Sequence, residues 1–134
     1  MFHFDGTNLK KRYEKRVMCN HMGNSVLIDG HLYGFDGTAH RGREVEFVCI
    51  RWGDGEEIWR SKGMRYGSLV AADRDLIVLS ERGEMFLGEA STEGWKPKAS
   101  AQVLGGRCWT MPVLANGRLF VRNARGDLAA FSAE

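Results

Sequence analysis

The sequence contains little cysteine and little proline. Its three cysteines, Cys19, Cys49 and Cys108, lie far apart and are odd in number, so they form neither a disulfide framework nor a C-x-x-C metal site. We expect them to be small buried apolar side chains, with a redox or metal role as the alternative. Proline occurs twice, and Pro97 suits only the edge or the beginning of a strand.

Long hydrophobic runs and a strong net charge are also missing. No apolar stretch approaches the ~20 residues of a membrane helix, so no membrane insertion is expected. Residues 1–11 show neither an apolar core nor a small-residue cleavage site, so no signal peptide is expected in this chain. The formal net charge of +2 is too small to indicate a polyanionic partner. With 43% hydrophobic and 27% charged residues, residues 1–134 fit a single globular domain.

No arrangement typical of catalysis is present. There is no Gly-x-Ser-x-Gly elbow, no carboxylate paired with a second across a cleft, and no helix after Gly105-Gly106 to bind phosphate. His21, His31 and His40 with Cys19 lack the regular spacing of a preformed zinc site. The sequence therefore predicts no catalytic residue and no metal site.

A repeat of about 43 residues is the main positive feature. Leu32, Leu76 and Leu119 occupy matching places, 44 and 43 residues apart. Each follows a turn signal that itself follows an apolar pair. A period of ~40–45 residues built from short strands is typical of β-propeller blades.

The turns of the repeat predict hairpins. Asp29-Gly30 and Asn116-Gly117 supply the two positive-φ residues of a type I′ turn. Asp73-Arg74 stands in the second repeat, where we expect a longer loop. No helix of useful length is indicated, because the strands are short and bounded by turns.

The fold class predicted is all-β, with about three four-stranded antiparallel blades. The repeats span roughly residues 25–66, 67–109 and 110–134, and the third has only three strands. Residues 9–17 look like a stray outer strand, with Tyr13 where the first repeat has Trp59. The chain thus reads as a partial propeller or as half of an oligomeric ring.

Three segments resemble the blades of the pyrroloquinoline-quinone-like β-propeller repeat proteins. Residues 24–37 are similar to one blade, and residues 49–59 are similar to the tryptophan-docking motif of that family, with Gly55, Glu56 and Trp59 matching. Arg51 and Asp54 stand where the family usually has Asp and Thr. Residues 112–123 also match the final blade of the family.

The resemblance implies either of two functions. Some members are quinoprotein dehydrogenases that hold pyrroloquinoline quinone with calcium, and others are scaffold propellers without a cofactor, such as outer-membrane assembly lipoproteins. The dehydrogenases carry adjacent cysteines and about eight blades, which this chain does not have. We expect a non-catalytic scaffold or binding module without a cofactor, with a fragment of a quinone-dependent oxidoreductase as the alternative. The family suggests a periplasmic or secreted location.

Three residues are predicted to dock one blade on the next. A Trp beside a Gly-containing turn buries a large flat ring, on the order of 200 Å². Trp59 with Gly55 fits this role, and Trp95 is the corresponding candidate in the second repeat.

The enlarged loop of the first repeat is the candidate contact site. Asp36, His40, Arg41 and Arg43 share this glycine-rich segment, and loops on a rigid scaffold concentrate binding residues. We predict a ligand or partner contact there, against the alternative of a merely solvated insertion. The basic run at residues 10–16 is interpreted as a solvated edge strand and not as a phosphate-binding patch.

Three blades are too few to close a ring, since propellers typically have 4–8. An open stack exposes apolar faces that require a partner. Either two copies form a six-bladed ring, each lending its N-terminal strand to the other's third blade, or the remaining blades of a larger propeller cover these faces. A separate protein partner is a further possibility.

Overall fold

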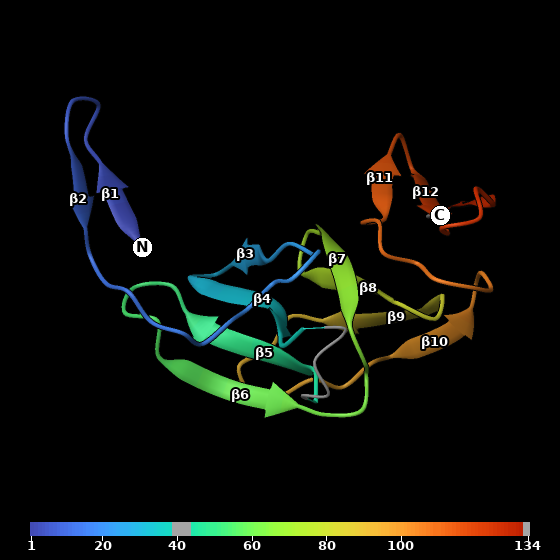
Figure 1. The fold of residues 1–134 in the computed structure, drawn as a ribbon, viewed down its shortest axis with the longest axis horizontal. Coiled ribbons are helices and arrows are strands. Elements are labelled where there is room, and N and C mark those ends of the chain that lie inside the picture. Colours follow the sequence, from blue (N-terminus) through green and yellow to red (C-terminus); the bar gives the residue numbers. More distant parts are fainter. Residues whose placement is uncertain (39–43, 133–134) are drawn as a thin grey trace.

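The computed structural model describes residues 1–38 and 44–132. Every regular element in these residues is a β-strand, and all sheets are antiparallel. Three larger sheets follow one another along the chain as blades, and a separate hairpin precedes them (Figure 1). The prediction of an all-β fold built from propeller blades is confirmed.

The first sheet contains four strands in sequence order. They are β3 (Val26–Ile28), β4 (His31–Asp36), β5 (Glu46–Arg51) and β6 (Glu57–Ser61). Asp29 and Gly30 join β3 to β4 with φ angles of 47° and 74°, which agrees with the predicted type I′ turn.

The second sheet repeats this order with β7 (Gly67–Ala72), β8 (Asp75–Ser80), β9 (Glu84–Glu89) and β10 (Ala99–Gln102). Ala72 pairs with Asp75, so only two residues, Asp73 and Arg74, connect β7 to β8. The longer loop expected there is wrong. Asp73 adopts a φ of 52°, a conformation that Asp tolerates, and no additional residue is needed.

The third sheet has three strands. They are β11 (Val113–Ala115), β12 (Arg118–Arg122) and β13 (Leu128–Ser132). Asn116 and Gly117 form the tight turn between β11 and β12, both with positive φ. Among the described residues β13 is an edge strand, and no fourth strand lies beyond it.

The N-terminal hairpin consists of β1 (Phe2–Phe4) and β2 (Leu9–Lys11), which pair only with each other. The strand expected over residues 9–17 therefore ends at Lys11, because its partner β1 is short. The hairpin and the third sheet lie at opposite ends of the molecule (Figure 1).

The apolar core lies between the sheets in two clusters. The first joins the first and second sheets around Phe35, Phe47 and Leu76. The second joins the second and third sheets around Leu79 and Val121. Each sheet thus buries one face against its neighbour, as stacked propeller blades do.

Candidate protein-binding surface

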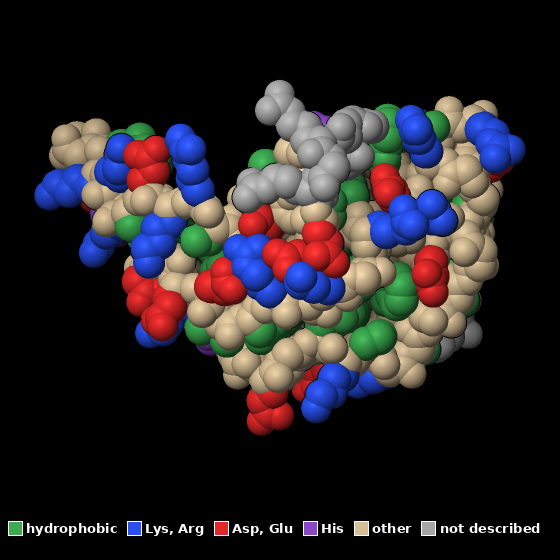
Figure 2. All heavy atoms as spheres, turned by 60° about the horizontal axis from the view of Figure 1, so that its bottom comes forward, with side chains coloured by type: hydrophobic (Ala, Val, Ile, Leu, Met, Phe, Trp, Pro, Cys, Tyr) green, Lys and Arg blue, Asp and Glu red, His purple; other side chains and the backbone are tan. Residues whose placement is uncertain are grey.

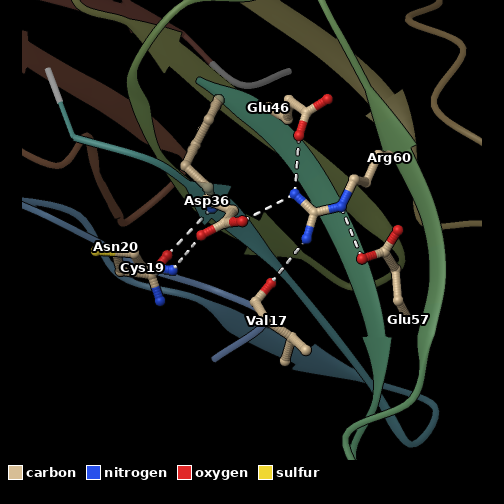
Figure 3. Close-up of polar contacts among 8 residues, drawn as sticks. Val17, Cys19, Asn20, Asp36, Glu46, Glu57 and Arg60 are labelled. Carbon is tan, nitrogen blue, oxygen red and sulfur yellow. Dashed lines mark hydrogen bonds and ion pairs between the residues drawn. The ribbon is translucent and has the colours of Figure 1, made fainter. Parts of the chain in front are cut away.

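Asp36 lies in a cluster of ion pairs on the first sheet (Figure 3). Its Oδ2 accepts a hydrogen bond from Nη1 of Arg60 at 2.8 Å. The same nitrogen donates to Oε2 of Glu46 at 2.8 Å, and Nε of Arg60 donates to Oε2 of Glu57 at 2.7 Å. Burial disfavours the charged guanidinium, but the hydrogen bonds to Asp36, Glu46 and Glu57 outweigh it and raise the pKa of Arg60 above its ordinary value. Arg60 thus stays charged and holds the three carboxylates together.

This cluster also fastens the crossing segment (residues 13–24), which leads from the hairpin into the first sheet. The backbone N–H of Cys19 donates to Oδ1 of Asp36 at 2.9 Å (Figure 3). The segment passes directly over Gly34, where there is no room for a larger residue: a Cβ there would come within 2.8 Å of the Asn20 side chain. Both carboxylate oxygens of Asp36 are therefore engaged within the chain, and this is a structural role.

The other residues of the predicted contact loop are His40, Arg41 and Arg43. They lie outside the described residues. The Asp36 side chain is 27% exposed within its ion cluster. Contact of this loop with a ligand or partner stays a prediction.

Trp59 and Trp95 lie between the first and second sheets. Nε1 of Trp59 donates to the backbone oxygen of Ser91 at 2.8 Å, which links β6 to the chain after β9. The rings of Trp59 and Trp95 both pack edge-on against Phe47, with centroid distances of 5.5 and 5.1 Å. Phe47 is fully buried. Aromatic rings therefore fill the outer half of this interface.

Gly55 supports the crossing segment. Its φ is 69°, and a Cβ there would lie 2.6 Å from the Tyr13 ring. The hydroxyl of Tyr13 donates to the backbone oxygen of Trp52 at 2.7 Å. A glycine is required here by both the backbone conformation and the close contact. Its lack of a side chain lets Tyr13 of the crossing segment pack against the first sheet.

The outer half of the interface between the second and third sheets is hollow, unlike that of the first interface. Cys49 pairs with Trp59 in the first sheet, and the matching pair of the second sheet is Leu87 with Ala99. An alanine thus stands where the first sheet has a tryptophan. The result is a mainly apolar groove of about 410 Å³. Its lining includes Ile77, Met85, Leu87, Ala101, Leu119 and Phe131.

Strand β13 forms the free edge beside this groove. It pairs with β12 on one side, and Phe131 and Ser132 line the groove on the other. Charged side chains and proline commonly protect an edge strand from pairing. The sequence of β13, Leu-Ala-Ala-Phe-Ser, contains neither. The edge is therefore suited to accept another strand.

The outward face of the third sheet carries an apolar strip between two arginines. Val113, Phe120 and Ala130 are cross-strand neighbours in this strip, and Arg118 and Arg122 lie on either side of Phe120 along β12. Val113 is 55% exposed and Leu128 is 68% exposed. Uncovered apolar surface of this kind indicates an interaction site.

Residues 1–38 and 44–132 contain no helix that is long and apolar enough to span a membrane. In the same part of the chain, no three His, Cys, Asp or Glu side chains are grouped to hold a metal ion.

Sequence reasoning noticed the missing fourth strand of the third repeat but did not identify the groove. The available signal was Ala99, because alignment of the second repeat on the first places it at the position of Trp59. A small residue at a docking position, next to an incomplete sheet, indicates a cavity.

Comparison with known proteins supports the fold. No protein-family model matches the sequence, and no curated protein sequence matches it. Two solved structures are similar. One is the computationally designed Ika8 protein, with a TM-score of 0.63 and 7% identity over 84% of this chain and 33% of the other. The second is BamB from Moraxella catarrhalis, with a TM-score of 0.52 and 19% identity over 82% of this chain and 42% of the other. The chain thus spans less than half of each solved chain, and the likeness to BamB supports a propeller-like fold.

Proposed function

We propose that this chain is a non-catalytic propeller module that binds an extended protein segment in the groove between its second and third sheets. The observation that carries the proposal is the unpaired edge of β13 beside an apolar groove of about 410 Å³. An extended segment that joins such an edge gains main-chain hydrogen bonds, and its alternate side chains enter the groove. The proposal requires no cofactor.

The floor of the groove supports this kind of ligand. It includes Ala99 and Ala101, small side chains of β10 that are exposed. Large apolar side chains of an added strand would pack on them as Trp59 and Trp95 pack on Phe47 in the first interface. Burial of such side chains supplies affinity, and the ladder to β13 supplies orientation.

We also propose that the repeats are of the pyrroloquinoline-quinone-like type, with blades at roughly residues 25–66, 67–109 and 110–134. The motif of Gly55, Glu56 and Trp59 supports this assignment. The propeller-like fold shared with BamB agrees with it.

A labelled peptide tests the binding site. The probe is a short fluorescein-labelled peptide in which phenylalanine and threonine alternate, and fluorescence anisotropy measures its binding to the full chain. We expect saturable binding, weakened at least about tenfold when the peptide is N-methylated at alternate residues, because the ladder to β13 is then lost.

Matched variants locate the site. Ala101→Arg places a long charged side chain in the groove and should abolish binding, whereas Ala115→Arg changes an equally exposed alanine on β11 and should not. No binding of the peptide by the wild-type chain in its monomeric state, or equal effects of the two substitutions, would contradict the proposal.

A further inference from the structure

The N-terminal hairpin has a mainly apolar face without a partner. Phe2 pairs with Lys11 and Phe4 pairs with Leu9, so the two phenylalanines, Leu9 and one lysine, Lys11, share this face. Phe2, Phe4 and Leu9 are 55%, 66% and 65% exposed. Neither strand contacts any other strand, and the hairpin stands off from the body as a lobe (Figure 2). An isolated two-stranded hairpin is marginally stable in water, so this face requires a partner.

The base of the hairpin is held firmly. The backbone oxygen of Met1 accepts hydrogen bonds from the N–H groups of both Arg12 and Tyr13, at 2.9 and 3.4 Å. Two residues therefore oppose one, which is the arrangement of a β-bulge and shifts the alternation of side chains by one position. Tyr13, which packs on Gly55 of its own first sheet, thus lies on the opposite face from Leu9. The apolar face is directed away from the chain's own first sheet.

The order of the strands indicates where the hairpin belongs. β6 and β10 are each the last strand of a sheet, and each leads into the first strand of the next sheet. β2 leads into β3, the first strand of the first sheet, in the same way. By this topology β2 takes the place of a last strand in a preceding sheet. The described sheet without such a fourth strand is the third.

On this basis we propose that the N-terminal hairpin of a second copy of this chain occupies the groove, joining the edge of β13 and packing Phe2, Phe4 and Leu9 against it. This inference rests on the proposed function, because it names the segment that the groove binds. Within one copy the hairpin and the third sheet are at opposite ends of the molecule (Figure 1), so the contact forms between copies.

Symmetry supports a pair of copies. Two copies of three blades related by a half turn make six blades, within the 4–8 typical of propellers. Each hairpin then reaches the groove of the other copy, and the contact closes without leaving a free site.

Light scattering after size-exclusion chromatography of the full chain tests the pairing. The expected mass is twice the 15.1 kDa of one chain. The double substitution Phe2→Ser with Phe4→Ser should raise the dissociation constant of the pair about 100-fold or more. Met111→Ser is the matched control, because Met111 is similarly exposed at 48% but lies in the chain between β10 and β11, and it should leave the pair intact.

A mixing experiment tests whether the hairpin of one copy binds the groove of the other. Ala101→Arg should also separate the copies. A mixture of the double hairpin variant with Ala101→Arg should recover pairs at raised concentration, because one hairpin and one groove in the mixture remain intact. A monomeric wild-type chain, or a dimer insensitive to the hairpin and groove substitutions, would overturn the inference.

The peptide probe separates this inference from the proposed function. A wild-type monomer that binds the alternating peptide in the groove overturns the second-copy inference and leaves the proposed function standing. A wild-type monomer that does not bind the peptide overturns both.

Discussion

The two interfaces between sheets are built on the same repeat but are filled differently. Between the first and second sheets, Trp59 and Trp95 close the outer half around the buried ring of Phe47. Between the second and third sheets, Ala99 stands at the position of Trp59, and the third sheet ends one strand earlier. The first interface is therefore a packed core, and the second combines a packed inner half with an open outer half. Within the described residues, a small side chain in place of a large one and the absence of a fourth strand thus leave one of the two interfaces open as a groove.

The two ends of the chain differ in the same way. The outward face of the first sheet lies beneath the crossing segment, and Ile50 on that face is only 4% exposed. On the outward face of the third sheet Leu128 is 68% exposed. The ion cluster of Arg60 and Asp36 fastens the segment that covers the first face. The crossing segment thus covers part of the outward face of the first sheet, where Leu27 remains 52% exposed.

The largest expected difference comes from truncation of matching core positions. Phe47 pairs with Phe35, and Met85 pairs with Leu79 at the same place of the next repeat. Phe47→Ala should lower the free energy of unfolding by ~3–5 kcal/mol, because it leaves a cavity between the two tryptophans. Met85→Ala should cost about 1 kcal/mol, since Met85 already borders the open groove. Urea unfolding measures both, and equal losses would contradict the contrast.

Alkaline pH should act on the first interface. Burial raises the pKa of the Cys49 thiol to about 11. As pH rises, the folded chain therefore keeps this proton after the unfolded chain has lost it. The stability that the protonated Cys49 contributes is complete below pH 9, falls between about pH 9 and 11, and is lost above that range. The loss should reach about 2–3 kcal/mol. Burial also raises the pKa values of Tyr33 and Tyr66, which act in the same direction.

The control for this titration is Cys49→Ala. Its free energy of unfolding should depend less steeply on pH over the same range, as measured by urea unfolding at a series of pH values. A slope that matches the wild type would show that Cys49 is not a source of the alkaline loss.

The smallest effect on stability is expected from making the second interface resemble the first. Ala99→Trp places in the groove the side chain that the first sheet carries at Trp59. The free energy of unfolding should change by about 1 kcal/mol or less, because the new ring remains partly exposed without a fourth strand above it. Binding of the alternating peptide should nevertheless be lost, as measured by fluorescence anisotropy. Retained affinity would show that the peptide does not enter the groove.

The prediction from sequence succeeded where the physical cause is local. Asp29-Gly30 and Asn116-Gly117 form the predicted turns because only a few residue types adopt positive φ without strain. The turn signals and the regular spacing of the apolar residues beside them likewise predicted the strands of the repeats. The longer loop predicted at Asp73-Arg74 was wrong, because it counted one extra residue there, whereas these two residues alone make the turn and Asp73 adopts the required conformation.

The sequence by itself determined the all-β class, the period of the repeat and the number of strands in the third sheet. The tertiary structure alone decided that Asp36 is bound to Arg60, that the hairpin stands free, and that a groove lies beside β13. Turns and strand alternation depend on neighbours in sequence. Cavities and ion clusters depend on which side chains from distant segments meet in the folded chain. The groove, for example, forms because Ala99 of the second sheet occupies the position that Trp59 occupies in the first.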